Sequence, residues 1–245
     1  MSRSTYLIAG LFGSFAVSCF ALVLAPQAQL GGLQPRFTEE EGKISDIYPV
    51  NQSGIAEQGR RIYAREGCVY CHTQQVRDPQ AGLDILRGWG ERRSVARDYL
   101  YDSPPFLGST RLGPDLSNVG SATWRNEAKG ATAPAKRDTR WHLLHLYSPT
   151  ELVSETNHPP YRYLFEERKI SGERSANALN LTGKDAPEAG MEVVPTAEAE
   201  ALVGYLLSLD RNAELPEAKA LPAAGTAPAP AAAADAAPAQ PAPAQ

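Results

Sequence analysis

The residues whose types and spacing most clearly suggest chemistry are Cys68-Val69-Tyr70-Cys71-His72. On a helical turn, positions i and i+3 project from one side, so the two thiols can reach two vinyl groups of one porphyrin. Two thioether bonds would then fix the ring, and His72 would be carried beneath the iron as an axial ligand. The motif therefore predicts one covalent haem c held by Cys68, Cys71 and His72.

A Cys-x-x-Cys pair can also be a redox dithiol or half of a zinc site. A zinc site needs two further soft ligands at suitable spacing, and the third cysteine, Cys19, lies inside an apolar run. A thioredoxin-like dithiol requires a βαβ context, which the surrounding sequence does not show. Three cysteines, two of them in one motif, also exclude a disulfide framework. Haem attachment is the interpretation that fits the motif best.

The ligand on the other side of the iron is left open by the motif. Its candidates are His142, His145, His158 and Met191, or no residue at all. His158 precedes a proline, and a residue in that place is driven to an extended conformation, which suits a stiff ligand loop. Met191 lies in a Gly-Met-Glu sequence before the last expected helix and is the alternative. His142 and His145 share one expected helix with Trp141, which favours packing or hydrogen bonding.

The elements that would position these residues are mostly helical. A helix is expected from about Gly54 to Arg65, with Ser53 as its N-cap, and the haem motif follows it directly. Residues 73–140 are rich in loops and include a polar insertion at about 121–139. A short helix is expected over Arg140 to Leu146, and a last helix from about Thr196 to Leu209.

An almost unbroken apolar stretch runs from Tyr6 to Ala25 without a charge. At about 1.5 Å per residue, roughly 20 residues span about 30 Å, the thickness of the hydrocarbon core of a bilayer. A cleaved signal peptide is the alternative, but its apolar core is usually shorter, and Pro26 follows this one directly. We therefore expect a retained anchor over residues 1–25 and a polar linker over 26–52.

Two further segments complete the expected organisation. Residues 53–211 form one domain, and residues 212–245 are almost all Ala and Pro. This tail has too few apolar side chains to offset the entropy of ordering, so we expect it to be disordered. The net charge of −4 gives no basic excess that would suggest nucleic acid. No carboxylate pair, nucleophile with a base or phosphate loop would make the chain catalytic by itself.

The flanking helices resemble those of class I cytochromes c, whose first and last helices cross at small and aromatic residues. Here the matching residues are Gly59 and Tyr63 before the motif, and Leu202, Tyr205 and Leu206 near the end. The resemblance implies a mainly α fold: a class I cytochrome c-like domain with long loops, preceded by one transmembrane helix.

The segment Arg111-Leu112-Gly113-Pro114-Asp115-Leu116 looks like the Gly-Pro loop of the same family. The resemblance implies that the Pro114 carbonyl accepts a hydrogen bond from Nδ1 of His72, and that Leu116 packs on the porphyrin. Such a bond fixes the tautomer and holds the other ring nitrogen toward the iron. Arg77 and Arg111 flank the two haem motifs, and their guanidinium groups could pair with the haem propionates.

Several blocks in order resemble the mono-haem subunit (subunit II, FixO/CcoO-like) of cbb3-type cytochrome c oxidases. They are GCVYCHTQQVR at 67–77, YLYDSPPFLGSTRLGPDLSNVG at 99–120, WHLLHLYSPTELV at 141–153 and HPPYRYLFE at 158–166. The resemblance implies an electron-transfer subunit beside a haem–copper catalytic subunit that reduces oxygen. Electrons would arrive from another cytochrome c subunit or a soluble donor. It also implies a single-pass protein of the bacterial inner membrane with its haem domain in the periplasm, and Arg3 before the helix is consistent with this.

One departure from that family concerns the sixth ligand. The family usually has Met-Pro where this chain has His158-Pro159, and there the methionine is the axial ligand. Either this haem is bis-histidine, or ligation has moved to Met191. Because methionine ligation raises the potential, a bis-histidine haem would have a lower midpoint than a His/Met relative.

Three other functions fit the motif. The first is a stand-alone, membrane-tethered cytochrome c carrier, which would purify without haem b or copper. The second is the haem c subunit of a related nitric oxide reductase. The third is a haem-based sensor, which would need an open iron site that binds carbon monoxide.

Overall fold

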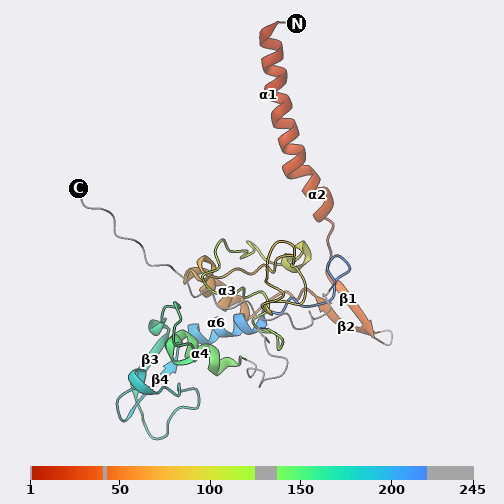
Figure 1. The fold of residues 1–245 in the computed structure, drawn as a ribbon. Helices are drawn as coiled ribbons and strands as arrows, with labels where there is room; N and C mark the ends of the chain where they lie inside the picture. The colour runs from red at the N-terminus through yellow and green to blue at the C-terminus, as the bar shows by residue number, and fades with distance from the viewer. Residues whose placement is uncertain (1, 41–42, 125–136, 220–245) are drawn as a thin grey trace, which may run out of the picture.

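A long helix leads the chain away from the remaining elements (Figure 1). The computed structural model describes residues 2–40, 43–124 and 137–219. Helix α1 (Arg3–Cys19), a π-helical segment (Phe20–Leu24) and α2 (Ala25–Leu30) form one run of 28 residues. A window of 18 residues within it has a mean hydropathy of 2.3 and no buried part. A helix this long and apolar is compatible with a membrane anchor.

The helical run continues beyond the anchor expected at residues 1–25 and occupies the start of the expected linker. Its π-helical segment ends just before Pro26, and the Ala25 N–H bonds to the Phe20 carbonyl five residues back. Proline has no N–H, and its ring clashes with the carbonyl four residues earlier in a regular helix. The wider π turn accommodates this residue, and the helix goes on to Leu30.

The rest of the expected linker contains a hairpin of β1 (Arg36–Glu40) and β2 (Lys43–Tyr48), paired antiparallel. The hairpin is tied to the domain at its end. The Tyr48 hydroxyl donates to Asp98 at 2.6 Å, and Asp98 forms an ion pair with Arg92 at 2.8 Å. Both charged side chains are almost fully buried, with 0% and 1% of their surface exposed. Because each charge has its partner, this pair can be buried.

Helices α3 (Ile55–Arg65) and α6 (Ala197–Ser208) pack against each other at the centre of the domain (Figure 1). A Cβ atom on Gly59 would lie only 1.9 Å from the Ala201 carbonyl oxygen, so the two backbones touch at this glycine. The rings of Tyr63 and Tyr205 meet edge to face beside it, with centroids 5.4 Å apart. This contact confirms the expected crossing at small and aromatic residues.

The two helices begin differently from each other. Gly54, not the expected Ser53, is the N-cap of α3; its φ is +60°, and no side chain caps the helix. A positive φ costs a glycine little, which explains why the helix starts there. Thr196 caps α6, because its side chain accepts a hydrogen bond from the Ala199 N–H.

A second group of helices and strands lies at the end of the domain away from the hairpin of β1 and β2 (Figure 1). Helix α4 (Thr139–Tyr147) begins at Asp138, whose carboxylate accepts from the Trp141 N–H at 2.8 Å, and the short helix α5 (Pro149–Leu152) follows. Strands β3 (Phe165–Lys169) and β4 (Met191–Pro195) pair antiparallel. The sequence analysis did not predict these strands, because β3 is mostly charged and lacks the alternation of a half-buried strand.

The C-terminal segment is ordered further than expected. Leu215 and Ala218 are buried, and Glu217 pairs with Arg97 at 2.6 Å. Residues 212–219 therefore pack on the domain, although the composition of 212–245 predicted disorder from residue 212. Residues 220–245, and 125–136 of the expected insertion, lie outside the described residues.

Candidate haem site

The Cys-x-x-Cys-His motif forms one tight turn directly after α3. Gly67 makes the corner in the left-handed region, with φ +74°, and Cys68–Tyr70 form a 3-10 turn. The N–H groups of Cys71 and His72 both bond to the Cys68 carbonyl, at 3.1 and 3.0 Å. Both thiols are free and partly buried. One turn therefore carries the two thiols and the histidine together.

The environment of Cys68 does not suit thiol–disulfide chemistry. Burial, and then the nearby Glu66 carboxylate, raise the pKa of this thiol to about 12. The thiolate is the nucleophile in disulfide exchange, and catalytic cysteines have lowered pKa values. Among the residues that the structure describes, no group of three or more His, Cys, Asp or Glu side chains could hold a metal ion. Neither a redox dithiol nor an all-protein zinc site is supported.

The Gly-Pro loop holds His72 from one side. Nδ1 of His72 lies 2.7 Å from the Pro114 carbonyl oxygen, so in the neutral ring this nitrogen donates and Nε2 is left as the free electron-pair donor. Gly113 packs directly on the ring: a Cβ there would lie 2.2 Å from Cε1 of His72. Leu116 is buried, and its N–H donates to the Thr73 carbonyl at 2.8 Å. The loop thus fixes the orientation of the imidazole.

His158 lies close to the same imidazole. The ring centroids of His72 and His158 are 6.3 Å apart, and the ring planes are inclined by 49°. A nitrogen lies about 1.2 Å from its ring centre and binds a metal at roughly 2 Å, so two imidazoles on opposite sides of one metal have centres about 6.4 Å apart. The observed spacing matches that value. The spacing of the two rings therefore suits a haem iron between them.

The surroundings of both rings favour the neutral form of the imidazole. Burial lowers the pKa of His72, against the hydrogen bond to Pro114, and burial followed by the charge of His72 lowers the pKa of His158 to about 4. A neutral imidazole keeps the lone pair that a metal needs. The backbone N–H of His158 donates to Thr156 Oγ1 at 3.1 Å, which stabilises the loop before the proline. Tyr161 lies beside the ring, with centroids 5.6 Å apart.

The other expected candidates have different surroundings. Met191 begins β4, pairs with Lys169 of β3 and donates its N–H to the Glu188 carbonyl at 2.9 Å. His142 and His145 lie on α4, and burial lowers their pKa values to about 4 and about 3. His145 contacts the His158 ring at a centroid distance of 4.5 Å, a contact that the sequence analysis did not anticipate.

The two arginines expected near the propionates share an acidic partner. Arg77 and Arg111 bond to the same buried carboxylate, Asp84, at 2.9 and 2.6 Å. Nε of Arg111 also donates to Thr73 Oγ1 at 2.9 Å, which links this pair to the residue after His72. The sequence analysis missed Asp84; its position between Leu83 and Ile85 was the only signal. Arg111 thus connects Thr73, the residue after the Cys-x-x-Cys-His motif, to the buried Asp84.

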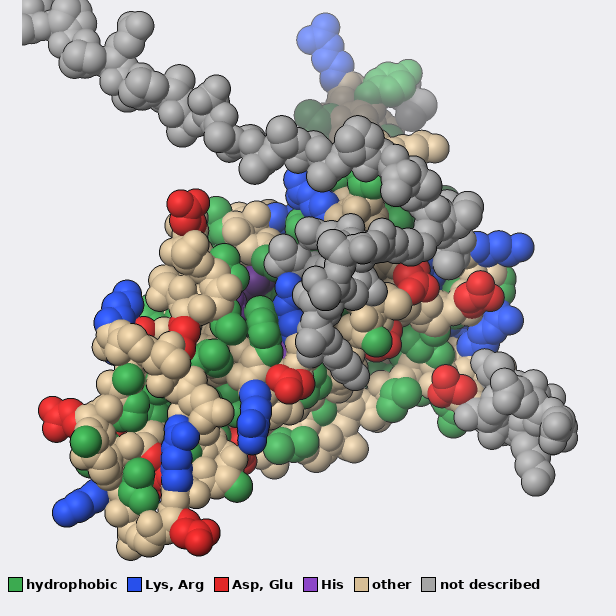
Figure 2. Space-filling view, turned by 60° about the horizontal axis from the view of Figure 1, so that its bottom comes forward, with side chains coloured by type: hydrophobic (Ala, Val, Ile, Leu, Met, Phe, Trp, Pro, Cys, Tyr) green, Lys and Arg blue, Asp and Glu red, His purple; other side chains and the backbone are tan. Residues whose placement is uncertain are grey.

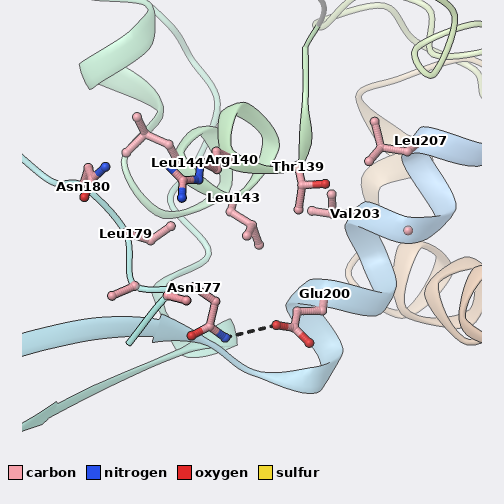
Figure 3. A pocket seen from close by; sticks show the side chains of 13 residues that line it. Thr139, Arg140, Leu143, Leu144, Asn177, Leu179, Asn180, Glu200, Val203 and Leu207 are labelled. Atoms are coloured by element: carbon pink, nitrogen blue, oxygen red, sulfur yellow. Dashed lines mark hydrogen bonds between the residues drawn. The ribbon is translucent and has the colours of Figure 1, made fainter. Parts of the chain in front are cut away.

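A separate cavity of about 430 Å³ lies between α4, residues 176–180 and α6 (Figure 3). Asn177 and Glu200 are hydrogen-bonded across its wall at 3.2 Å. None of the motif cysteines or histidines lines it, so this cavity is distinct from the haem site. On the face drawn in Figure 2, histidine surface is visible only as small patches in a recess bordered by hydrophobic side chains.

A comparison with known protein families agrees with this geometry. The family described as "Cytochrome C oxidase, mono-heme subunit/FixO" matches residues 14–184, which is more than half of the chain and includes the Cys-x-x-Cys-His turn, the Gly-Pro loop and His158. A search of curated proteins found no match. The chain therefore belongs to the FixO family of mono-haem cytochrome c oxidase subunits.

Proposed function

We propose that this protein is a membrane-anchored mono-haem c-type cytochrome that passes electrons to the catalytic subunit of a haem–copper terminal oxidase. Cys68 and Cys71 would hold the haem through thioether bonds, and His72 and His158 would be its axial ligands. The observation that carries the proposal is the pair of half-buried imidazoles, 6.3 Å apart, one of which is oriented by the Pro114 carbonyl.

The chain's own residues hold the ligands in place. The bond from Nδ1 of His72 to Pro114 fixes the tautomer, and Gly113 leaves no room for the ring to turn toward the loop. His158 is held by its short loop and by the neighbouring rings. When bound, the haem supplies reversible one-electron chemistry, and axial ligands set its potential. Leu116 would pack on the porphyrin, and Arg111 would support the motif from its buried partner Asp84.

The proposed partners and location follow from the family and the first helix. The exposed apolar run over Arg3–Leu30 would cross the bacterial inner membrane once and place the haem domain on the periplasmic side. Electrons would come from another cytochrome c subunit or a soluble donor. Oxygen reduction would belong to the haem–copper partner.

A spectrum of the purified full-length protein tests the ligand assignment. We expect His158→Ala to abolish the low-spin six-coordinate spectrum, whereas Met191→Leu, the matched control for the alternative ligand, leaves it unchanged. The haem should stay attached to the denatured chain in acidified organic solvent. An unchanged spectrum in His158→Ala would rule out His158, and release of the haem from the denatured chain would refute covalent attachment.

Replacing His158 with methionine tests the effect on potential. Because a methionine ligand raises the reduction potential, we expect His158→Met to have a higher midpoint than the wild type in a potentiometric titration. An equal or lower midpoint in a variant that keeps a six-coordinate haem would contradict a bis-histidine wild type.

Purification in mild detergent tests the role as an oxidase subunit. We expect haem b and copper to copurify with the tagged chain from its native membrane, together with oxygen consumption. If the chain came out with haem c alone after purification from intact membranes, the stand-alone carrier would be the better function.

A further inference from the structure

The histidine on α4 that touches His158 is not one of the two ligands proposed above. The ring of His145 contacts the His158 ring, with centroids 4.5 Å apart, and stacks on Trp141 at 4.8 Å with only 18° between the planes. Trp141 and His145 are four residues apart and therefore neighbours on one face of the helix. Helix α4 thus presents a pair of stacked rings to the proposed ligand.

The identity of this residue is not explained by core packing. Nδ1 of His145 is buried and has no hydrogen-bond partner within the described part of the chain. A buried polar atom without a partner destabilises the fold, and an apolar side chain of similar shape would avoid that loss. Nδ1 of His158 is likewise buried without a partner in that part of the chain, so no hydrogen bond joins this atom to the neighbouring imidazole. What His145 supplies at this position is therefore the flat surface of its ring.

The ligand loop and α4 are also joined through their backbones. The Tyr161 N–H donates to the carbonyl of Leu146, the residue after His145, at 2.7 Å. At the other side of the ligand, the Thr156 N–H donates to the Val153 carbonyl at 3.2 Å, which closes a turn directly after α5. The loop that carries His158 therefore has a fixed position along α4, and the His145 ring is held where it meets the ligand.

We propose that His145 is a positioning residue: its ring, stacked on Trp141, fixes the plane of the His158 imidazole relative to that of His72. This inference rests on the proposed axial ligation by His72 and His158. Groups that orient a ligand tune the metal as the ligands themselves do. The angle between two axial imidazole planes determines how the iron d orbitals split, so it is read directly in the electron paramagnetic resonance spectrum of the ferric haem.

The test compares variants of His145 in the purified full-length protein. His145→Phe keeps a ring, whereas His145→Ala removes it. We expect Phe to retain the wild-type g values and midpoint potential, and Ala to shift the largest g value and the midpoint while the haem stays six-coordinate. If the Ala variant does not assemble, His145→Gln removes the ring while retaining a side chain of intermediate size and applies the same test.

A second histidine on the same helix provides the matched control. His142 is also buried, and its Nε2 also lacks a partner within the described residues, but its ring contacts Trp141 and not His158. We expect His142→Phe to leave the g values unchanged.

Three results would overturn the inference. The first is wild-type g values and midpoint in both His145→Ala and His145→Gln. The second is the same shift in His145→Phe as in His145→Ala, and the third is that shift in His142→Phe. Failure of the proposed function is a different result. It would show as a wild-type spectrum that does not depend on His158 at all, whatever happens at His145.

Discussion

Replacement of Gly59 by alanine tests the contact between α3 and α6. The Cys-x-x-Cys-His turn directly follows α3, so this contact helps to position it. The new Cβ would lie 1.9 Å from the Ala201 carbonyl oxygen and 2.7 Å from Cβ of Tyr205. An ordinary carbon–oxygen contact is about 3.3 Å, so the two helix backbones would have to separate by roughly 1.4 Å. That movement would also loosen the contact between Tyr63 and Tyr205.

The expected loss of stability follows from two opposed effects. Overpacking of a well-packed core costs about 1–3 kcal/mol. We use the upper end of this range because the clashing atom, the Ala201 carbonyl oxygen, belongs to the backbone and cannot move like a side chain. Alanine in a helix gains about 1 kcal/mol over glycine. The net destabilisation is therefore roughly 2 kcal/mol, and at about 2–4 °C per kcal/mol for a domain of this size, Tm should fall by roughly 4–8 °C.

Thermal unfolding of the purified full-length protein in detergent, followed by far-UV circular dichroism, measures this effect. Gly204→Ala is the matched control, because it lies in α6 and faces α3, but its Cβ would make an ordinary contact of 3.4 Å with Ile55. We expect the control to have an equal or higher Tm than the wild type. If Gly59→Ala were as stable as Gly204→Ala, the proposed backbone contact would be refuted.

Three further changes test the site and its supports. We expect Gly113→Ala to lower the yield of haem-loaded protein and to perturb the low-spin spectrum, because its Cβ would lie 2.2 Å from Cε1 of His72; a normal yield with a wild-type spectrum would contradict this. Asp98→Asn should destabilise the fold by about 3–5 kcal/mol in thermal unfolding, because it leaves the Arg92 charge buried without its partner, and a change within error would refute that. Burial tends to raise the pKa of Asp84, but hydrogen bonds from two arginines outweigh it and lower the pKa below its usual value. Its contribution to stability is therefore complete above the unfolded-state pKa of about 4 and is lost as pH falls through the lower folded-state pKa. Acid unfolding of Asp84→Asn should lack this part of the pH dependence, and identical acid transitions would show that the pairing is unimportant.

The sequence predicted the features of this protein that depend on local spacing. The Cys-x-x-Cys-His turn needs only residues 68–72, and the apolar run and the pattern of α6 are set by side chains a few residues apart. Glycine at position 59 and tyrosine at 63 and 205 also indicated the helix crossing. Local spacing did not reveal the hairpin of β1 and β2, the strands β3 and β4, or the packing of residues 212–219. Those elements are stabilised by partners far away in the chain rather than by their own pattern.

The proposal of His158 among the axial-ligand candidates rests on the three-dimensional structure. His142, His145, His158 and Met191 are all able to bind iron, and sequence reasoning left this choice open. Tertiary structure brings the His158 ring to 6.3 Å from His72 and places Met191 in a strand opposite Lys169. It also gives the arginines expected near the propionates a shared partner, the buried Asp84. The proposed covalent attachment involves neighbouring residues, so local sequence is enough to predict it. The proposed ligation from the second side depends on a contact between distant segments, which only the folded chain brings together.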